Sequence, residues 1–184
     1  MQRLIGLTGQ AGCGKDTVAR ILMKNHDFSS IAFADPIRIG AAAIFGAWTD
    51  DRADKEATIE WIGKSPREIM QLLGTEFGRE LIHPDIWIRA LERRLAVRTN
   101  QGPNFVVTDC RFQNEANWIR DQGGQLWHIQ RRSAEPVASH VSENGLAFDA
   151  GYCHLLDNNG DFQDLSAAVD RLMNSTRLPC RDSI

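Results

Sequence analysis

The sequence predicts an α/β fold of three layers, in which helices cover both faces of a five-stranded parallel sheet. Short apolar segments alternate along the chain with amphipathic segments, and this order is typical of strands that are each followed by a helix. The 184 residues are 42% hydrophobic and 24% charged, an ordinary balance for one globular domain. We therefore expect a single domain over residues 1–184.

The first two expected strands each lead into a helix. Arg3–Thr8 is an apolar strand that runs into the glycine-rich segment Gly9–Gly14. A helix follows from Lys15. Its expected apolar face consists of Val18, Ala19, Ile21 and Leu22. Ser30–Ala34 reads as the second strand, and Pro36 opens a helix rich in alanine and isoleucine.

Helix-start signals dominate the middle of the chain. Trp48–Lys64 is charged and poorly periodic, and both a helix and a loop stay open for it. Ser65 is expected to cap a helix that has Pro66 at its first position and Glu68 closing a capping box. Pro84 marks the start of another helix.

Three strands and two helices complete the expected fold. The strands are Phe105–Thr108, Leu126–Ile129 and His154–Leu156. The helices are Asn114–Gln122, which ends at Gly123, and Asp164–Met173.

Composition argues against several classes of protein. No apolar run reaches the roughly 18–20 residues that cross a bilayer, and Met1–Leu7 lacks the pattern of a signal peptide. The four cysteines form no C-x-x-C pair, so neither a zinc site nor a disulfide framework is indicated. A net charge of −3 is unlike the broad basic excess of a nucleic-acid binder. We expect a cytoplasmic protein with no membrane or nucleic-acid partner.

One motif carries a specific chemistry, because it satisfies G-x-x-x-x-G-K between a strand and a helix. Its residues, with the two that follow, are Gly9, Gln10, Ala11, Gly12, Cys13, Gly14, Lys15, Asp16 and Thr17. Backbone N–H groups of such a loop surround the phosphates of a bound ATP, and Lys15 is expected to bridge the β- and γ-phosphates. Asp16 stands where a Ser or Thr usually binds Mg²⁺, so we expect Asp16 to bind the metal directly or through water. The alternative is a glycine-rich turn that caps a helix without a nucleotide.

With this loop, a series of further motifs resembles the phage-type deoxynucleoside monophosphate kinases. The motifs, in chain order, are the G-K-D-T form of the loop, Ala34–Arg38, Arg67–Thr75, Trp87, Asp109–Arg111, His128–Arg131, Ser139–Leu146 and Asp157–Gly160 followed by Leu165. The resemblance covers almost the whole chain and implies a P-loop kinase fold. It also implies transfer of the γ-phosphate of ATP to a (deoxy)nucleoside 5′-monophosphate, with Mg²⁺, in the cytoplasm of a host if the chain is phage-encoded.

The resemblance assigns the acceptor to an insert at about residues 36–100 and the ATP phosphates to a small lid at about 131–150. Arg38 and Arg67 would hold the acceptor phosphate, and Trp87 would stack on its base. The neighbouring acceptor residues are Asp35, Gln71, Thr75 and Arg111. Arg131 would close with the lid, although Arg132 follows it where such kinases often have a proline. The resemblance is also compatible with a homodimer.

Each assigned residue has a plainer interpretation. Trp87 could be a core residue, and Gln71 and Thr75 could be surface and cap residues. Arg67, at the second position of its helix, faces an unfavourable dipole that a phosphate would relieve, which favours a functional role beside the catalytic Lys15 and Arg131.

Two strand-end acids and a nearby arginine have double interpretations as well. Asp109 could support Mg²⁺ through water as a catalytic residue or cap a loop, and Asp35 has the same two readings. Arg111 could bind phosphate, or it could pair with Asp109 or Glu115. The segment with His140, Ser142 and Glu143 could belong to the lid or be a polar surface loop; we favour the loop.

Two other functions share part of this pattern. One is another small-molecule P-loop kinase, acting on dephospho-coenzyme A, phosphomevalonate or a ribonucleotide. The other is a GTP-dependent switch, which needs an N-K-x-D segment that Asp157–Gly160 does not match.

Overall fold

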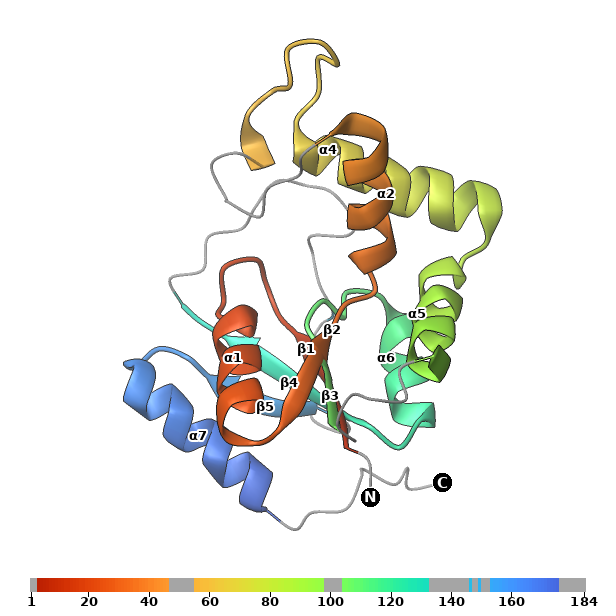
Figure 1. Cartoon of the computed structure of the whole chain (residues 1–184). Coiled ribbons are helices and arrows are strands. Elements are labelled where there is room, and N and C mark those ends of the chain that lie inside the picture. Colours follow the sequence, from red (N-terminus) through yellow and green to blue (C-terminus); the bar gives the residue numbers. More distant parts are fainter. Residues whose placement is uncertain are drawn as a thin grey trace. The chain divides into compact units, whose positions relative to one another are not determined.

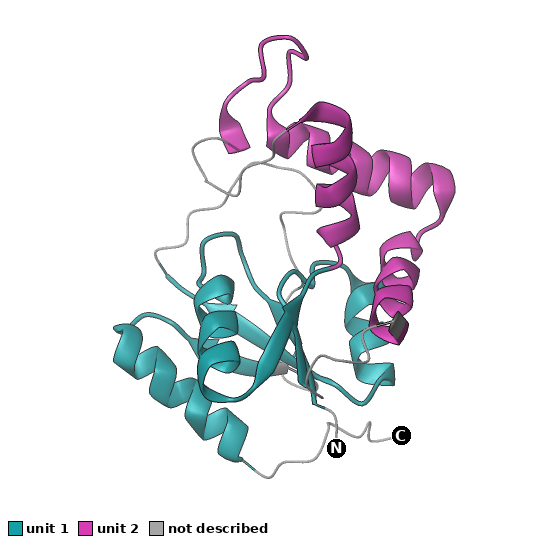
Figure 2. Ribbon diagram, viewed as in Figure 1, with its two compact units in different colours: residues 1–32, 98–184 teal, residues 33–97 magenta. Residues whose placement is uncertain are grey.

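The computed structural model describes residues 3–46, 55–97, 104–132 and 153–175, together with Leu146 and Asp149. The chain divides into two compact units (Figure 2). Unit 1 comprises Met1–Ala32 and Arg98–Ile184, and unit 2 comprises Phe33–Val97. Most residues of the expected acceptor insert, 36–100, therefore fall in unit 2, whereas the expected lid is largely outside the described residues.

Unit 1 contains a five-stranded sheet in which every pairing is parallel. Its strands are β1 (Leu4–Thr8), β2 (Phe28–Ile31), β3 (Asn104–Val107), β4 (Gln125–Gln130) and β5 (Cys153–Asp157). Their order across the sheet is β2-β3-β1-β4-β5. The predicted five-stranded parallel sheet is confirmed.

Strand β2 differs from its predicted bounds of Ser30–Ala34. It runs from Phe28 to Ile31 because these residues pair with Asn104 and Val107 of β3. The N–H of Thr108 then donates to the carbonyl of Ile31 at 3.0 Å. The apolar residues after Ile31 are buried in the turn that follows the strand, and their apolar sequence was therefore mistaken for a strand.

Helices cover both faces of the sheet (Figure 1). Helix α1 (Lys15–Asn25) and helix α7 (Phe162–Asn174) share one buried cluster with the sheet residues Leu7 and Trp127. Helix α6 (Gln113–Asp121) packs on the other face against β1 and β4. There Gly6 leaves room for Ile119, since a Cβ on Gly6 would lie 2.3 Å from its Cδ1. The predicted three layers are confirmed within unit 1.

The helix starts follow local signals. The apolar face predicted for α1 is buried in full, as Val18, Ala19, Ile21 and Leu22. Helix α7 begins at Phe162, two residues earlier than predicted, because the carboxylate of Asp161 accepts hydrogen bonds from the N–H groups of Gln163 and Asp164. Asp161 is thus the N-cap that the prediction overlooked.

Unit 2 contains helices α2 (Asp35–Phe45), α4 (Pro66–Gln71), η1 (Leu72–Ile82) and α5 (Ile86–Val97). The predicted capping box is confirmed at the start of α4, where the Glu68 carboxylate accepts from the N–H of Ser65 at 2.8 Å and Ser65 Oγ accepts from the N–H of Glu68 at 3.3 Å. In the open segment Trp48–Lys64, the described part includes a tight loop closed by the N–H of Ile59 and the carbonyl of Lys64.

Element η1 was not predicted. It continues α4 as a π-helix of 11 residues. Runs of π-helix are rare and have no simple sequence pattern. Two glycines within it, Gly74 and Gly78, are buried. The ring of Trp87 lies so close to Gly78 that a Cβ there would be 2.3 Å from Trp87 Cζ2. The indole of Trp87 therefore packs against the π-helix at Gly78.

Among the described residues, no helix combines the length and apolar character needed to cross a membrane.

Candidate functional site

The loop between β1 and α1 has a backbone that requires glycine. Gly9 has φ 131° and Gly14 has φ 107°, which lie in the region that other residues rarely adopt. A Cβ on Gly9 would lie 2.3 Å from the carbonyl oxygen of Ile129, and one on Gly14 would lie 2.3 Å from Asn158 Nδ2. The neighbouring backbone and side chains therefore lie close to the loop, and its conformation depends on glycine at these two positions.

Lys15 folds back over this loop. Its Nζ donates to the carbonyl oxygens of Gly9 at 2.7 Å and Gln10 at 2.8 Å, and it lies 3.8 Å from Cys13 Sγ. Burial lowers the pKa of Lys15 below its ordinary value, and the charge of Arg111 acts in the same direction. An anion bound at this loop would pair with the ammonium group and so offset the unfavourable effect of burial on its charge.

The first turn of α1 fits a phosphate. Its N-cap is Gly14, which supplies no side-chain hydrogen bond to the helix, so the first N–H groups lack the usual cap. Such a helix end favours anions through both its N–H groups and its dipole. Together with the glycine loop and Lys15, this observation favours a nucleotide over a structural turn.

Asp16 and Thr17 follow Lys15 in this first turn. Asp16 is exposed, whereas Thr17 Oγ1 accepts a hydrogen bond from Arg20 Nη2 at 3.2 Å. No cluster of three or more His, Cys, Asp or Glu side chains suited to a metal occurs in the described part of the chain. Mg²⁺ commonly takes one or two carboxylates and completes its shell with phosphate oxygens and water. Asp16 suits that kind of site.

Asn158, in the turn after β5, contacts the loop from the other side. Its Nδ2 donates to the carbonyl of Cys13 at 2.8 Å, and its backbone N–H donates to Gln130 at 2.9 Å. Sequence reasoning noted the Asn158–Gly160 motif but assigned it no role. The contact spans 145 positions of the chain, so no local pattern could have located it.

Polar groups also meet at the carboxyl ends of the central strands. Thr8 on β1 is in register with His128 on β4, and Asp109 follows β3, the other neighbour of β1. Thr8 is fully buried, and its Oγ1 has no hydrogen-bond partner among the described residues. Burial lowers the pKa of His128, and the charge of Lys15 lowers it further. The edge of the sheet that carries the loop is therefore polar, as in ligand sites of parallel sheets.

The residues after Asp109 are held by Glu115. This buried carboxylate accepts hydrogen bonds from the backbone N–H groups of Arg111 at 2.7 Å and Phe112 at 3.0 Å. It thereby fixes the turn that leads into α6. The charge of Arg111 acts on Lys15, which is consistent with a position near the glycine loop. Its role in phosphate binding stays a prediction.

Arg131 is exposed just after β4. The next residue, Arg132, donates its N–H to Asn159 Oδ1 at 2.8 Å. Of the expected lid, residues 133–145 lie outside the described residues, and so do His140, Ser142 and Glu143. The lid stays a prediction.

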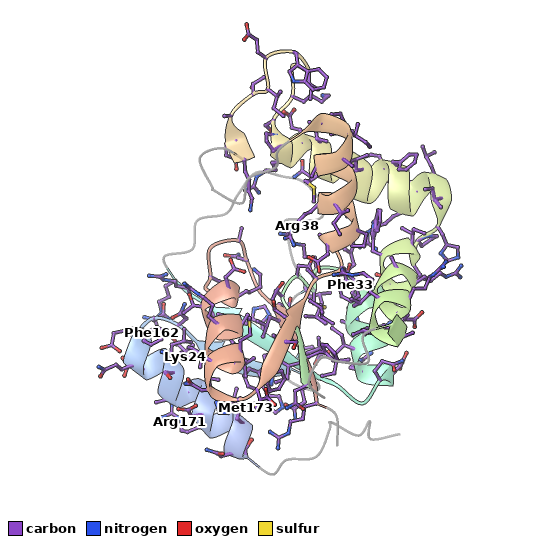
Figure 3. The ribbon with its side chains drawn as sticks, viewed as in Figure 1. Lys24, Phe33, Arg38, Phe162, Arg171 and Met173 are labelled. Atoms are coloured by element: carbon purple, nitrogen blue, oxygen red, sulfur yellow. The ribbon has the colours of Figure 1, made fainter. Side chains whose placement is uncertain are left out.

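In unit 2, three of the charged side chains form one cluster. Asp35 Oδ1 accepts from Arg38 Nη1 at 3.1 Å, and Asp35 Oδ2 accepts from Arg94 Nη1 at 2.9 Å. Arg38 lies on α2 (Figure 3), and Arg94 lies on α5. The prediction included Asp35 and Arg38 but missed Arg94, which looks like any charged helix residue in the sequence.

The remaining acceptor candidates lie on α4, η1 and α5. Arg67 Nε forms an ion pair with Glu56 Oε1 at 2.7 Å. The indole N–H of Trp87 donates to the carbonyl of Gly74 at 2.7 Å, so this ring is held within unit 2. Gln71 and Thr75 are partly buried. The roles of all four in acceptor binding stay predictions.

A hollow in unit 1 is lined by none of the predicted site residues. It has a volume of about 340 Å³ and lies between α1 and α7. Its lining residues are Arg20, Ile21, Lys24, Asn25, Phe162 and Ser166, of which Lys24 and Phe162 are labelled in Figure 3.

Comparisons with known proteins agree on one family. Residues 57–169 match the family model described as deoxynucleotide monophosphate kinase. Over 186 residues the chain is 30% identical to a protein of Acanthamoeba polyphaga mimivirus that is named as a deoxynucleotide monophosphate kinase, covering 90% of this chain and 93% of that one. Over 185 residues it is 26% identical to the deoxynucleoside-5′-monophosphate kinase of Escherichia phage T5, covering 66% of this chain and 73% of that one.

A solved structure has a similar fold. The protein TT1252 from Thermus thermophilus matches with a TM-score of 0.52 at 17% sequence identity, over 96% of this chain and 98% of that chain.

Proposed function

The chain belongs to the deoxynucleotide monophosphate kinase family, and from this we propose that it transfers the γ-phosphate of ATP to a deoxynucleoside 5′-monophosphate. The products are ADP and the deoxynucleoside diphosphate. The observation that carries the proposal is the glycine loop with Lys15 folded over it and an uncapped helix start behind it. This loop lies outside residues 57–169, so it supports nucleotide binding independently of the family model.

On the nucleotide side, the loop N–H groups, the start of α1 and Lys15 hold the phosphates of ATP. Asp16 binds Mg²⁺ directly or through water, and Asp109 supports it through water. Bound Mg²⁺ would neutralise negative charge on the phosphates. The partly buried Lys15 ammonium serves the same end, because a charge that is partly shielded from water interacts more strongly with a phosphate.

On the acceptor side, the cations of unit 2 supply the charge. Arg38 and Arg67 hold the monophosphate, because the planar guanidinium fork suits a phosphate better than the point charge of a lysine. Trp87 stacks on the base, with Asp35, Gln71 and Thr75 nearby. What supports these assignments is the order of the motifs and the membership of the family.

The chemical step needs no general base. A phosphate monoester has a second pKa near 6, so most of the acceptor is a dianion at neutral pH and its oxygen is already a nucleophile. That oxygen forms a bond to the γ-phosphorus while the bond from the γ-phosphorus to the bridging oxygen breaks, and ADP leaves with the electron pair. The protein has to bring two anions into line and offset the charge of the transition state. Lys15, Arg131 and the acceptor arginines can do both.

An assay of ADP release tests the proposal. ATP is offered with dAMP, dGMP, dCMP, dTMP or their ribose counterparts, and at least one deoxynucleotide should support rapid release. The same assay with dephospho-coenzyme A or phosphomevalonate, and with GTP alone, tests the two rival functions, which family membership does not favour. Activity on one of those substrates, and on no deoxynucleotide, would contradict the proposal.

Two further expectations belong to the same proposal. Closure of a lid with Arg131 would keep water from the γ-phosphate. A homodimer stays a prediction, and light scattering on the purified protein would test it.

A further inference from the structure

One carboxylate in unit 2 binds two arginines at once. Each oxygen of Asp35 accepts from a different guanidinium, Oδ1 from Arg38 at 3.1 Å and Oδ2 from Arg94 at 2.9 Å. The side chains of Asp35, Arg94 and Arg38 are 26%, 27% and 39% exposed. The cluster is therefore partly shielded from water, so its charges interact more strongly than they would at an open surface.

The charge of this cluster depends on Arg94. Asp35 and Arg38 alone form a neutral pair, and a dianionic phosphate that approached Arg38 would also meet the carboxylate. Arg94 adds a second positive charge, so the three side chains together carry a charge of +1. Asp35 engages one nitrogen of Arg38, and since a guanidinium has five N–H donors, the others can reach phosphate oxygens.

We propose that Arg94 is a positioning residue for the acceptor: it neutralises Asp35, so that Asp35 can orient Arg38 without cancelling its charge toward the monophosphate. The inference rests on the proposed function, since Arg38 is taken to bind the acceptor. Arg94 itself acts through Asp35. Partly exposed ion pairs contribute little to stability, so the main effect of Arg94 is on substrate binding.

The test compares Arg94→Met with Arg93→Met, in which the neighbouring exposed arginine of α5 is changed. Two quantities are measured for each protein: the dissociation constant of the accepted deoxynucleoside monophosphate by calorimetry, and the steady-state kinetics. In Arg94→Met, the dissociation constant and the KM for the acceptor should rise about 10-fold, roughly the effect of 1.4 kcal/mol. The KM for ATP should stay unchanged and kcat should change less than about threefold. Arg93→Met should resemble the wild type, and Arg94→Lys should restore most of the affinity.

A double variant separates charge from structure. In Asp35→Asn/Arg94→Met the carboxylate is gone, so Arg38 keeps its charge without Arg94. The acceptor affinity should recover at least about threefold relative to Arg94→Met, and it should stay below that of the wild type because Arg38 is no longer oriented by Asp35. A purely structural role for Arg94 instead makes the double variant bind at least as weakly as Arg94→Met, and that result would overturn the inference. A double variant that unfolds, as seen by circular dichroism, would also count against it.

The failure of this inference differs from the failure of the proposed function. If the wild type turns over a deoxynucleoside monophosphate and Arg94→Met binds it equally well, the inference alone is wrong. If the wild type binds the monophosphate in an Arg94-dependent way but never phosphorylates it, the proposed function alone is wrong. A wild type that binds none of these monophosphates overturns both.

Discussion

Lys15 illustrates how a side chain of the candidate site can work against the stability of the fold. Its ammonium group donates to two carbonyls of its own loop, yet burial still lowers its pKa. The charged form is therefore less favourable in the folded protein than in water. Because the unfolded chain binds the proton more tightly, the wild type should gain stability as the pH rises toward the ordinary pKa of lysine.

Replacement of Lys15 by Met should separate activity from stability. We expect kcat to fall by about 10²–10³-fold, as it does when one preorganised donor to a transition-state charge is removed. The thermal midpoint at pH 7 should not fall, because the variant no longer buries a charge. Steady-state kinetics and calorimetric unfolding measure the two effects, and a normal kcat or a clearly lower midpoint would contradict the prediction.

His128 should make the protein sensitive to acid. Burial and the charge of Lys15 lower its pKa, so below about pH 6.5 the unfolded chain takes up the proton more readily than the folded protein. The stability that depends on the neutral imidazole is present above pH 6.5 and is lost as the pH falls through the lowered pKa. Between pH 7.5 and pH 5, the midpoint of His128→Gln should fall less than that of the wild type. Parallel curves for the two proteins would show that His128 does not contribute.

At the scale of elements, the turn after β5 acts as a brace for the phosphate loop. Asn158 connects this turn to Cys13 through its side chain and to β4 through its backbone. The close approach of its Nδ2 to Gly14 means that loop and turn are fitted to each other. The brace should keep the loop N–H groups in place before a nucleotide arrives, which lowers the cost of ordering them on binding.

Asn158→Ala should therefore weaken ATP binding selectively. The lost hydrogen bond is worth about 1 kcal/mol, which corresponds to a rise in the KM for ATP of roughly fivefold. The KM for the acceptor should stay the same. Asn174→Ala, at the exposed C-terminal end of α7, serves as the control. Equal changes in both KM values would show that the substitution disturbs the whole protein and not the loop.

At the scale of the whole molecule, the two groups of site residues lie in different units. The loop, Asp109 and Arg111 belong to unit 1, whereas the acceptor candidates Arg38, Arg67 and Trp87 belong to unit 2. Under the proposed function, transfer between two anions requires both groups of residues to act on the reacting phosphates.

A bisubstrate analogue tests this requirement of the proposed function. Adenosine linked to the accepted deoxynucleoside through five phosphates should bind at least about 100-fold more tightly than the monophosphate alone, because the second contact becomes intramolecular. Lys15→Met and Arg67→Ala should each remove a large part of that gain. An affinity no better than that of the monophosphate would mean that the two groups never engage one ligand.

Most elements of the fold could be predicted, because the signals that start and stop them are local. The buried face of α1 follows from a period of 3.6 residues, and the start of α4 follows from Ser65, Pro66 and Glu68. Errors occurred where a local signal was ambiguous. The apolar turn after Ile31 resembled a strand, and the π-helix Leu72–Ile82 has no periodic pattern that distinguishes it from an α-helix.

The sequence by itself predicted the parallel sheet from the alternation of apolar and amphipathic segments, and the chain order of the motifs predicted the glycine loop and the kinase family. Each of these signals is carried by short stretches of neighbouring residues. The brace of Asn158 on Cys13 and the pairing of Asp35 with Arg94 join residues 145 and 59 positions apart. Such contacts exist only after the chain has folded, because burial and the meeting of distant side chains depend on how the elements pack. That packing decides which charges around the candidate site are offset and which are left for a substrate.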